Sequence, residues 1–274
     1  MSNHKLAILW GLCLVGVLGC GQDKYRHPSA ERYYEAGNKA LLKRKCWQAQ
    51  QLFQNLLSDF PGSHLVDDAQ YSLGQAYFCS KDYVTAIFEY ERLINEFPTS
   101  PFVDEARYQI GICYYRQSRG IHHDQDDTWK AIREFRRFAE DFPNSERVAD
   151  AEARIQELRN KLAAKKLMVA KSYLKWENLL SVVRYCEIIL TEFEDTDVVN
   201  LARFVLARAQ HRMEEPDKAV ESLRLLLSSD IPDDFRQEVE EEMEKALASV
   251  AKQQSVRPAS TEAQQPEQGP VDGK

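Results

Sequence analysis

Small and aromatic residues recur along the chain with a period of 37 residues. Gly37, Gly74 and Gly111 mark this period. An alanine follows the first two glycines by twelve residues, and an aromatic residue follows each alanine by four; the pairs are Ala49 with Phe53 and Ala86 with Tyr90. Residues four apart share one face of a helix, and a small residue lets a second helix approach closely. The pattern predicts units of two packed helices joined by a turn.

A proline closes each of the first three units. The motif Phe-Pro-x-Ser recurs at residues 60–63, 97–100 and 142–145. Two insertions interrupt the period, with eight extra residues between Gly111 and Ala131 and 14 between Pro143 and Ala170. The second insertion is rich in Ala, Glu, Arg and Leu, so we expect it to lengthen the first helix of a fourth unit by about four turns. The remaining marks are Ala170, Val182, Cys186 and Glu194 in the fourth unit, and Ala207, Ala219, Leu223 and Pro232 in a fifth.

These marks resemble the tetratricopeptide repeat, in which small, aromatic and proline positions follow in the same order over a helix-turn-helix unit. The expected fold is all-α, a tetratricopeptide-like helical-repeat solenoid of about five helix-turn-helix units. Repeats 1–3 would occupy residues 30–143. Repeats 4–5, with the lengthened helix and an acidic capping helix, would occupy residues 144–251. From residue 252 the chain is rich in Gln, Pro, Glu and Ser, which predicts a disordered tail over residues 252–274.

The start of the chain has the pattern of an export signal. The apolar run Leu6–Leu18 would make about 20 Å of helix, too short for a ~30 Å bilayer core but typical of a secretory signal peptide. It ends in Val17-Leu18-Gly19-Cys20, which resembles a bacterial lipobox. We therefore expect a signal peptide at 1–19, acylation of Cys20 and a lipidated linker at 20–29. Gly21, in place of aspartate, favours sorting to the outer membrane; ordinary signal cleavage beside an unmodified cysteine is the alternative.

Composition argues against several classes of function. Of the 274 residues 43% are apolar, which is enough for a core, and the net charge of −7 argues against nucleic acid as the main partner. No glycine lies between Gly120 and Gly269, so this stretch holds no glycine-rich phosphate loop. The motifs of serine hydrolases, zinc proteases and P-loop enzymes are missing from the sequence. We expect neither catalytic residues nor a cofactor.

Three positions around each periodic glycine tend to face the concave side of such a solenoid. They lie three residues before the glycine, one after it and four after it; they are Tyr34, Asn38 and Leu41, then Tyr71, Gln75 and Phe78, then Tyr108, Ile112 and Tyr115. An aromatic ladder with amides beside it could form a groove for an extended or aromatic-tipped peptide. Packing between adjacent units is the alternative for each tyrosine.

One cluster has residue types found in metal sites. His122, His123, Asp124, Asp126 and Asp127 lie together in the eight-residue insertion. Adjacent histidines in a turn usually diverge, and no cysteine or further histidine is near in sequence. We favour a solvated loop in which Asp127 or Thr128 caps a helix starting at Trp129.

Four cysteines lie beyond the signal region. Cys46 lies near the turn of the first unit and Cys79 near the end of the first helix of the second, while Cys186 takes a core position. A Cys46–Cys79 disulfide is one hypothesis for a protein in an oxidising compartment. Reduced cysteines in helical packing are the other.

The third unit carries the most specific sequence signature. The run Asp124-Gln125-Asp126-Asp127-Thr128 is followed by Phe142-Pro143-Asn144-Ser145, and then by Ala-Glu-Ala-Arg-Ile-Gln-Glu-Leu-Arg at residues 151–159. Together with the lipobox and the five units, this signature resembles the BamD family, lipoproteins of the outer-membrane β-barrel assembly (BAM) machinery. The resemblance extends over roughly residues 30–227.

The resemblance implies a non-enzymatic scaffold that is lipid-anchored to the outer membrane on its periplasmic side. Repeats 1–3 would engage unfolded outer-membrane proteins, whose signals often end in an aromatic residue. Repeats 4–5 would dock on the POTRA region of a BamA-like barrel protein, beside other BAM lipoproteins. Family members often carry an arginine in the second helix of unit four; that position is Tyr185 here, with Arg184 beside it. The alternative is a generic periplasmic tetratricopeptide-repeat lipoprotein that scaffolds cell-envelope or peptidoglycan enzymes.

Overall fold

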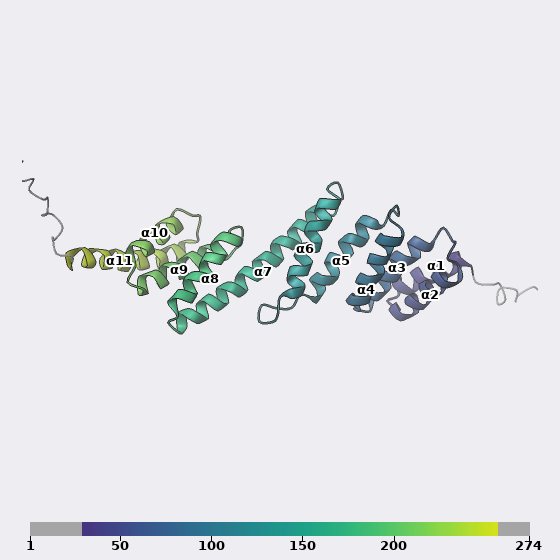
Figure 1. The fold of residues 1–274 in the computed structure, drawn as a ribbon, viewed down its shortest axis with the longest axis horizontal. Helices are drawn as coiled ribbons and strands as arrows, with labels where there is room; N and C mark the ends of the chain where they lie inside the picture. The colour runs from purple at the N-terminus through teal and green to yellow at the C-terminus, as the bar shows by residue number, and fades with distance from the viewer. Residues whose placement is uncertain (1–28, 257–274) are drawn as a thin grey trace, which may run out of the picture.

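The computed structural model describes residues 29–256, and this part of the chain consists of eleven helices and no strand. The helices are α1 (Ala30–Leu42), α2 (Cys46–Asp59), α3 (Val66–Cys79), α4 (Tyr83–Glu96), α5 (Val103–Gln117), α6 (Asp126–Asp141), α7 (Val148–Lys175), α8 (Leu179–Glu192), α9 (Val199–Arg212), α10 (Pro216–Leu227) and α11 (Asp233–Val256). They stack into an elongated body with α1 at one end and α11 at the other (Figure 1). The predicted all-α, tetratricopeptide-like solenoid is confirmed.

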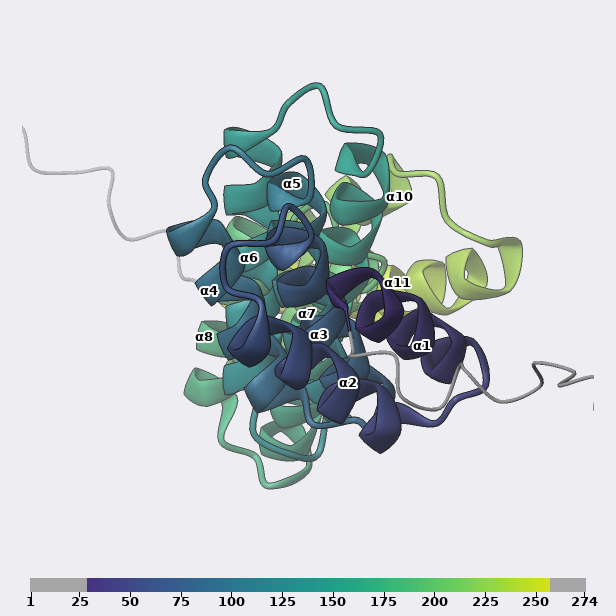
Figure 2. The same ribbon diagram turned by 90° about the vertical axis from the view of Figure 1, so that its right-hand side faces the viewer.

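Each helix packs mainly on its neighbours in sequence, so α1 to α10 form five pairs and α11 closes the stack. First helices of adjacent units also touch, as α7 does with α9 and α9 with α11. Seen along the long axis from the α1 end, the pairs lie behind one another and α11 projects to one side (Figure 2). This arrangement buries each unit only against its neighbours, as in other repeat proteins.

The periodic small and aromatic positions form the core. Ala49, Ala86 and Ala131 are completely buried, and the aromatic residues four positions later are buried with them. Cys186 takes the same position in the fourth unit and is also fully buried. The spacing read from the sequence therefore marks the face on which each second helix contacts its first helix.

The turn inside four of the five units contains a non-glycine residue in the left-handed region. These residues are Arg44, Lys81, Glu177 and Glu214, with φ of 54°, 65°, 57° and 61°. The next residue donates its N–H to a carbonyl five positions back, as from Lys45 to Ala40 at 2.9 Å, which satisfies an otherwise orphaned carbonyl at the helix end. The eight-residue insertion replaces this turn in the third unit.

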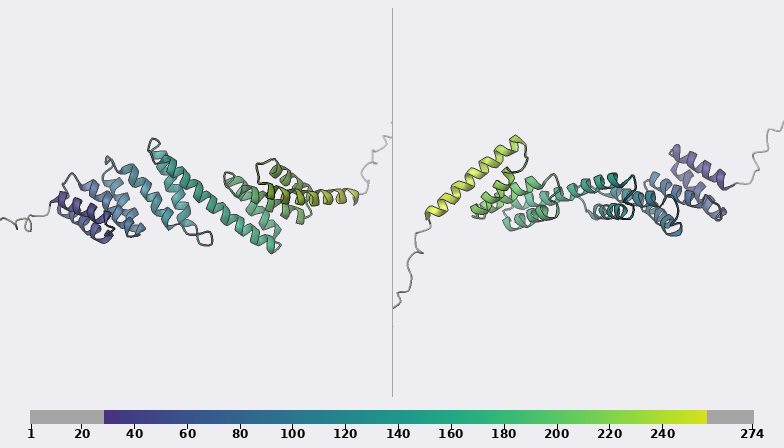
Figure 3. Two further views of the ribbon diagram at one scale, coloured as in Figure 1. Left: turned by 180° about the vertical axis from the view of Figure 1, so that it is seen from behind. Right: turned by 90° about the horizontal axis from the view of Figure 1, so that it is seen from above.

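Helix α7 joins the two halves of the body. It has 28 residues against 14 in α9, and the difference equals the 14-residue insertion, so the lengthened helix expected from the sequence is present. The views in Figure 3 show α7 running from α6 to α8. One apolar cluster extends along it, from Tyr108 on α5 to Ala209 on α9. The long helix is thus covered by core on both of its halves.

Several expectations concern residues beyond the described range. The signal peptide, the acylated Cys20 and most of the linker at 20–29 lie outside it, as do residues 257–274 of the tail. Helix α11 continues to Val256, so the first five residues assigned to a disordered tail are helical. Within residues 29–256, no helix combines the length and the apolar character needed to cross a bilayer.

Candidate functional site

Two of the three ladder tyrosines are buried between adjacent units. Tyr71 is 8% exposed and stacks on Phe102, with ring centroids 4.9 Å apart; Tyr108 is 3% exposed. The hydroxyl of Tyr108 donates to Asp150 in the first turn of α7. Burial raises the pKa of Tyr71 to about 12, and burial together with the Asp150 hydrogen bond raises that of Tyr108 to about 12. Both rings therefore hold one unit against the next.

This packing corrects the groove expected from the sequence. Tyr71, Tyr108 and the 9%-exposed Ile112 are not available to a peptide. The physical reason is that each tyrosine faces the start of the next first helix, as Tyr34 also does by donating to Asp68 at 3.3 Å. Tyr34 itself stays partly exposed.

Tyr115 is tied to α7. Its hydroxyl donates to Glu157 at 2.7 Å, and the guanidinium of Arg154 lies 4.7 Å from the centre of its ring. Asn38 and Gln75 are half-buried. Leu41 and Phe78 thus remain as the ladder residues that line a hollow.

That hollow lies at the carboxyl ends of α1, α3 and α5, and we call it the N-terminal hollow. Its volume is about 640 Å³, and it is lined by Leu41, Arg44, Phe78, Cys79, Lys81, Tyr83 and Arg116. Phe78 and Tyr83 meet edge to face with their centroids 5.3 Å apart. The hollow therefore combines an apolar wall with a cationic rim.

The three cations of the rim are exposed, and none forms an ion pair within the described part of the chain. Arg44 and Lys81 are the left-handed residues of the turns in the first and second units, and they lie 37 residues apart. None of these cations was among the site residues predicted from the sequence, although the 37-residue spacing of Arg44 and Lys81 is a visible signal. Arg116 carries no comparable periodic mark.

A disulfide lies at the edge of the N-terminal hollow. Cys46 at the start of α2 is bonded to Cys79 at the end of α3, with the Cα atoms 5.6 Å apart. The bond links the ends of two units immediately beside the turns that carry Arg44 and Lys81. It therefore ties the turn of Arg44 to the end of α3, next to the turn of Lys81.

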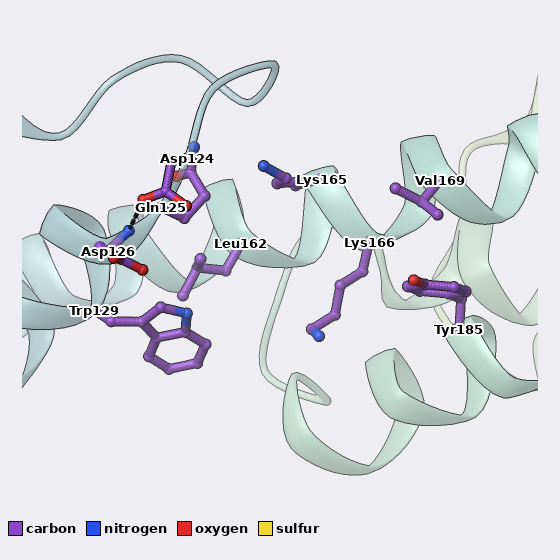
Figure 4. A pocket seen from close by; sticks show the side chains of 9 residues that line it. All are labelled: Asp124, Gln125, Asp126, Trp129, Leu162, Lys165, Lys166, Val169 and Tyr185. Carbon is purple, nitrogen blue, oxygen red and sulfur yellow. Dashed lines mark hydrogen bonds between the residues drawn. The ribbon is translucent and has the colours of Figure 1, made fainter.

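A second hollow of about 290 Å³ lies beside α7 and is called the waist hollow (Figure 4). It is lined by Asp124, Gln125, Asp126, Trp129, Leu162, Lys165, Lys166, Val169 and Tyr185. Trp129 is 44% exposed, and Lys166 extends between it and Tyr185 in Figure 4. Tyr185 stacks on Tyr173 at 5.7 Å. Of the two residues expected to dock a partner, Tyr185 lines this hollow, whereas the exposed Arg184 lies next to it in sequence only.

The loop before α6 is ordered by a buried glutamine. Gln125 donates to the carbonyls of Gly120 at 3.0 Å and His123 at 2.9 Å. Helix α6 begins at Asp126, three residues before the expected start, and Asp124 accepts from the Asp126 N–H at 2.8 Å. Capping by Asp127 or Thr128 was therefore the wrong assignment.

The described residues show no arrangement suited to metal or thiol chemistry. His122 and His123 are exposed, and between residues 29 and 256 no three His, Cys, Asp or Glu side chains are grouped so as to hold a metal ion. Burial raises the pKa of the Cys113 and Cys186 thiols to about 12, so neither is a thiolate at neutral pH.

This chain is similar to one family model and to several known proteins, among them the three described next. The model for the outer membrane lipoprotein family YfiO matches residues 26–225. Outer membrane protein assembly factor BamD of Rickettsia prowazekii (strain Madrid E) is 25% identical over 195 residues, which cover 69% of this chain and 77% of that protein. The TPR2AB domain of yeast Sti1 is 16% identical with a TM-score of 0.39, covering 80% of this chain and 98% of that one. A thermophilic tetratricopeptide protein of Thermus thermophilus is 15% identical with a TM-score of 0.34, covering 80% of this chain and 100% of that one.

Proposed function

The chain belongs to the YfiO family of outer membrane lipoproteins, and from this premise we propose that it is a lipid-anchored periplasmic scaffold of the BAM complex. In this role it binds unfolded β-barrel proteins and the POTRA region of a BamA-like barrel protein. The match of the family model over residues 26–225 carries the proposal. The hollows beside the stack supply binding surfaces for a scaffold without requiring any catalytic group.

The N-terminal hollow is the proposed substrate site. An unfolded chain that ends in an aromatic residue offers a flat ring and a terminal carboxylate. Leu41, Phe78 and Tyr83 give the ring an apolar wall, where aromatic pairs contribute about 0.5–1.5 kcal/mol beyond area burial. Arg44, Lys81 and Arg116 give the carboxylate a choice of charge-assisted hydrogen bonds. The hollow thus replaces the tyrosine ladder as the site for an aromatic-tipped peptide.

The waist hollow is the proposed docking site for the POTRA region. Trp129 and Tyr185 present partly exposed rings, and aromatic residues are enriched among the residues that dominate protein interfaces. Arg184 is exposed on the same helix, outside the lining of the hollow, and offers a further charge for a salt bridge with the partner. Other BAM lipoproteins would bind around this junction of the two halves.

Peptide binding tests the substrate site. We expect a fluorescent peptide ending in phenylalanine to bind the full chain, and binding to weaken about tenfold when Lys81 and Arg116 are both changed to alanine. A C-terminally amidated peptide should bind as weakly to the unaltered protein. Arg92→Ala is the matched control, because Arg92 pairs with Glu96 on α4 outside the hollow. Equal affinity of the free and amidated peptides would reject the carboxylate site.

Co-purification tests the docking site. In mild detergent the protein should recover a BamA-like barrel protein, and the Trp129→Ala, Tyr185→Ala double variant should recover much less of it while keeping its thermal unfolding midpoint within a few degrees. Recovery of cell-wall enzymes without any barrel protein would instead favour a generic envelope scaffold.

A further inference from the structure

A third hollow lies between the first helices of repeats 4 and 5 and the closing helix α11. Its volume is about 590 Å³, and we call it the C-terminal groove. Helix α7 contributes Lys171 and Lys175, and α9 contributes Arg208 and Arg212. The groove contains no residue of the N-terminal hollow or of the waist hollow. It therefore needs its own explanation.

The four cations of the groove form no ion pair with any residue between 29 and 256. Arg208 lies 5.9 Å from the centre of the Phe204 ring, and Arg212 donates to the Leu174 carbonyl at 3.4 Å. At the α5–α7 junction, by contrast, Arg147 forms an ion pair with Glu105 at 3.0 Å. In a chain of net charge −7, this groove is a local concentration of unpaired positive charge.

Helix capping explains only half of these cations. Lys175 and Arg212 lie in the last turns of α7 and α9, where positive charge is favourable beside the negative end of the helix dipole. Lys171 and Arg208 lie one turn earlier on the same helices, and that effect falls off within the last turn. Their position facing the hollow points instead to a ligand.

The floor of the groove is apolar. Leu174 and Phe204 are each 8% exposed and line the hollow between the cations. Glu238 of α11 adds one carboxylate. It lies one turn from Phe235, which meets Phe204 edge to face, so Glu238 is near the Phe204 end. Phe204 and Arg212 are eight residues apart on α9, or about 12 Å, which matches three to four residues of an extended chain.

We propose that the C-terminal groove binds an extended acidic segment of a partner protein. Acidic side chains pair with Lys171, Lys175, Arg208 and Arg212, and an apolar side chain between them packs on Leu174 and Phe204. Glu238 repels an acidic residue at its own end, so the acidic residues of the segment lie away from that end. The C-terminal groove contains none of the residues proposed for substrate or POTRA binding, so its test is independent of theirs.

An anionic bilayer fits the groove less well than a peptide does. The cations line a hollow rather than a flat or convex face, whereas lipid headgroups form an extended surface. Helix α11 beside the groove carries seven carboxylates, of which only Glu238 lines the groove. A short segment held inside the groove avoids the others, whereas an anionic surface that extends beyond the groove is repelled by them; they are Asp233, Asp234, Glu240, Glu241, Glu242 and Glu244.

Binding of a defined peptide to the full chain tests the proposal. The probe is a fluorescein-labelled ten-residue peptide of alternating glutamate and leucine, and its counterpart has lysine in place of every glutamate. We expect the glutamate peptide to bind, the lysine peptide to bind at least tenfold more weakly, and the affinity of the glutamate peptide to fall with added salt. Equal binding of the two peptides would overturn the proposal.

Two matched double variants locate the site. Lys171→Ala with Arg208→Ala should weaken binding of the glutamate peptide about tenfold or more. Arg133→Ala with Arg137→Ala removes the same charge from exposed positions on α6, and it should change the affinity less than twofold. Thermal unfolding checks that both variants are folded. Equal effects of the two pairs of substitutions would overturn the proposal that the groove binds the peptide. The proposal would also be overturned if vesicles of phosphatidylglycerol bound the protein through Lys171 and Arg208 and displaced the peptide.

Discussion

Gly74 packs directly against the ring of Tyr90: a Cβ atom on Gly74 would lie 2.5 Å from Cε1 of Tyr90. Equivalent contacts join Gly37 to Phe53 at 2.5 Å and Gly111 to Phe135 at 2.7 Å. The flat ring of each second helix therefore occupies the space that a side chain on the first helix would need. This contact is the physical reason that glycine recurs at the same position in successive units.

Changing Gly74 to alanine should destabilise the protein. The new methyl group must displace the buried ring of Tyr90, and such overpacking typically costs about 1–3 kcal/mol. Urea unfolding followed by circular dichroism measures the change. Gly62→Ala is the matched control, since nothing lies within 4 Å of a Cβ at Gly62. The packing argument fails if the two variants lose equal stability.

The turn residue Glu177 allows a test in which a substitution is expected to preserve or raise the free energy of unfolding. Its φ of 57° is unfavourable for a side chain and easy for glycine. Glu177→Gly should leave the free energy of unfolding equal or raise it by up to about 1 kcal/mol, whereas Glu177→Val should lower it by about 1 kcal/mol or more.

The same substitution at Glu187 supplies the comparison. Glu187 is exposed in the middle of α8, so glycine there should cost about 1 kcal/mol. Chemical denaturation of the three variants beside the unaltered protein gives the order of stability. A loss at Glu177→Gly as large as at Glu187→Gly would show that the left-handed turn carries no strain.

The fold could be predicted from the sequence because close packing of the helices requires small residues at regularly spaced positions. Gly37, Gly74 and Gly111 are required by rings on the partner helices, so their spacing alone identifies the units. The direction in which a tyrosine side chain points produces no such pattern in the sequence. Tyr71 and Tyr108 stand at positions that tend to face the groove, yet the next unit covers both rings.

The hollows were harder to predict because their residues come from several units. The N-terminal hollow combines Arg44, Phe78 and Arg116 from three successive first-helix ends, and the C-terminal groove combines α7, α9 and α11. Which helix ends converge depends on the curvature of the stack, and no local sequence pattern determines that curvature.

Alkaline pH should weaken the folded state through its buried tyrosines. Tyr71 has an ordinary pKa of 10.0 that burial raises to about 12, so the folded chain holds the proton more tightly than the unfolded chain. The stabilisation is complete below pH 10 and is lost as pH rises towards 12. Tyr108 and the thiols of Cys113 and Cys186 act in the same direction.

The substitution Tyr71→Phe isolates one of these contributions. It removes the ionisable hydroxyl and keeps the ring against Phe102, so stability should fall less steeply with pH in the variant. Urea unfolding at half-unit steps from pH 8 to pH 11.5 measures the slope. An unchanged slope would mean that Tyr71 ionises equally in the folded and unfolded chains.

Breaking the Cys46–Cys79 bond should loosen the N-terminal repeats and leave the C-terminal ones intact. The bond closes a loop between residues 33 apart in sequence, which corresponds to roughly 3–4 kcal/mol in the chain-entropy model. Repeats contact only their neighbours, so the loss should stay local. In the Cys46→Ser, Cys79→Ser variant, hydrogen exchange should accelerate in α1–α4 and remain unchanged in α9–α11.

A reductant should lower the melting temperature of the unaltered protein and have no effect on the variant. Equal melting temperatures of the unaltered protein with and without reductant would show that the bond does not form. Because the bond holds the turns of Arg44 and Lys81 together, the variant should also bind a peptide ending in phenylalanine more weakly.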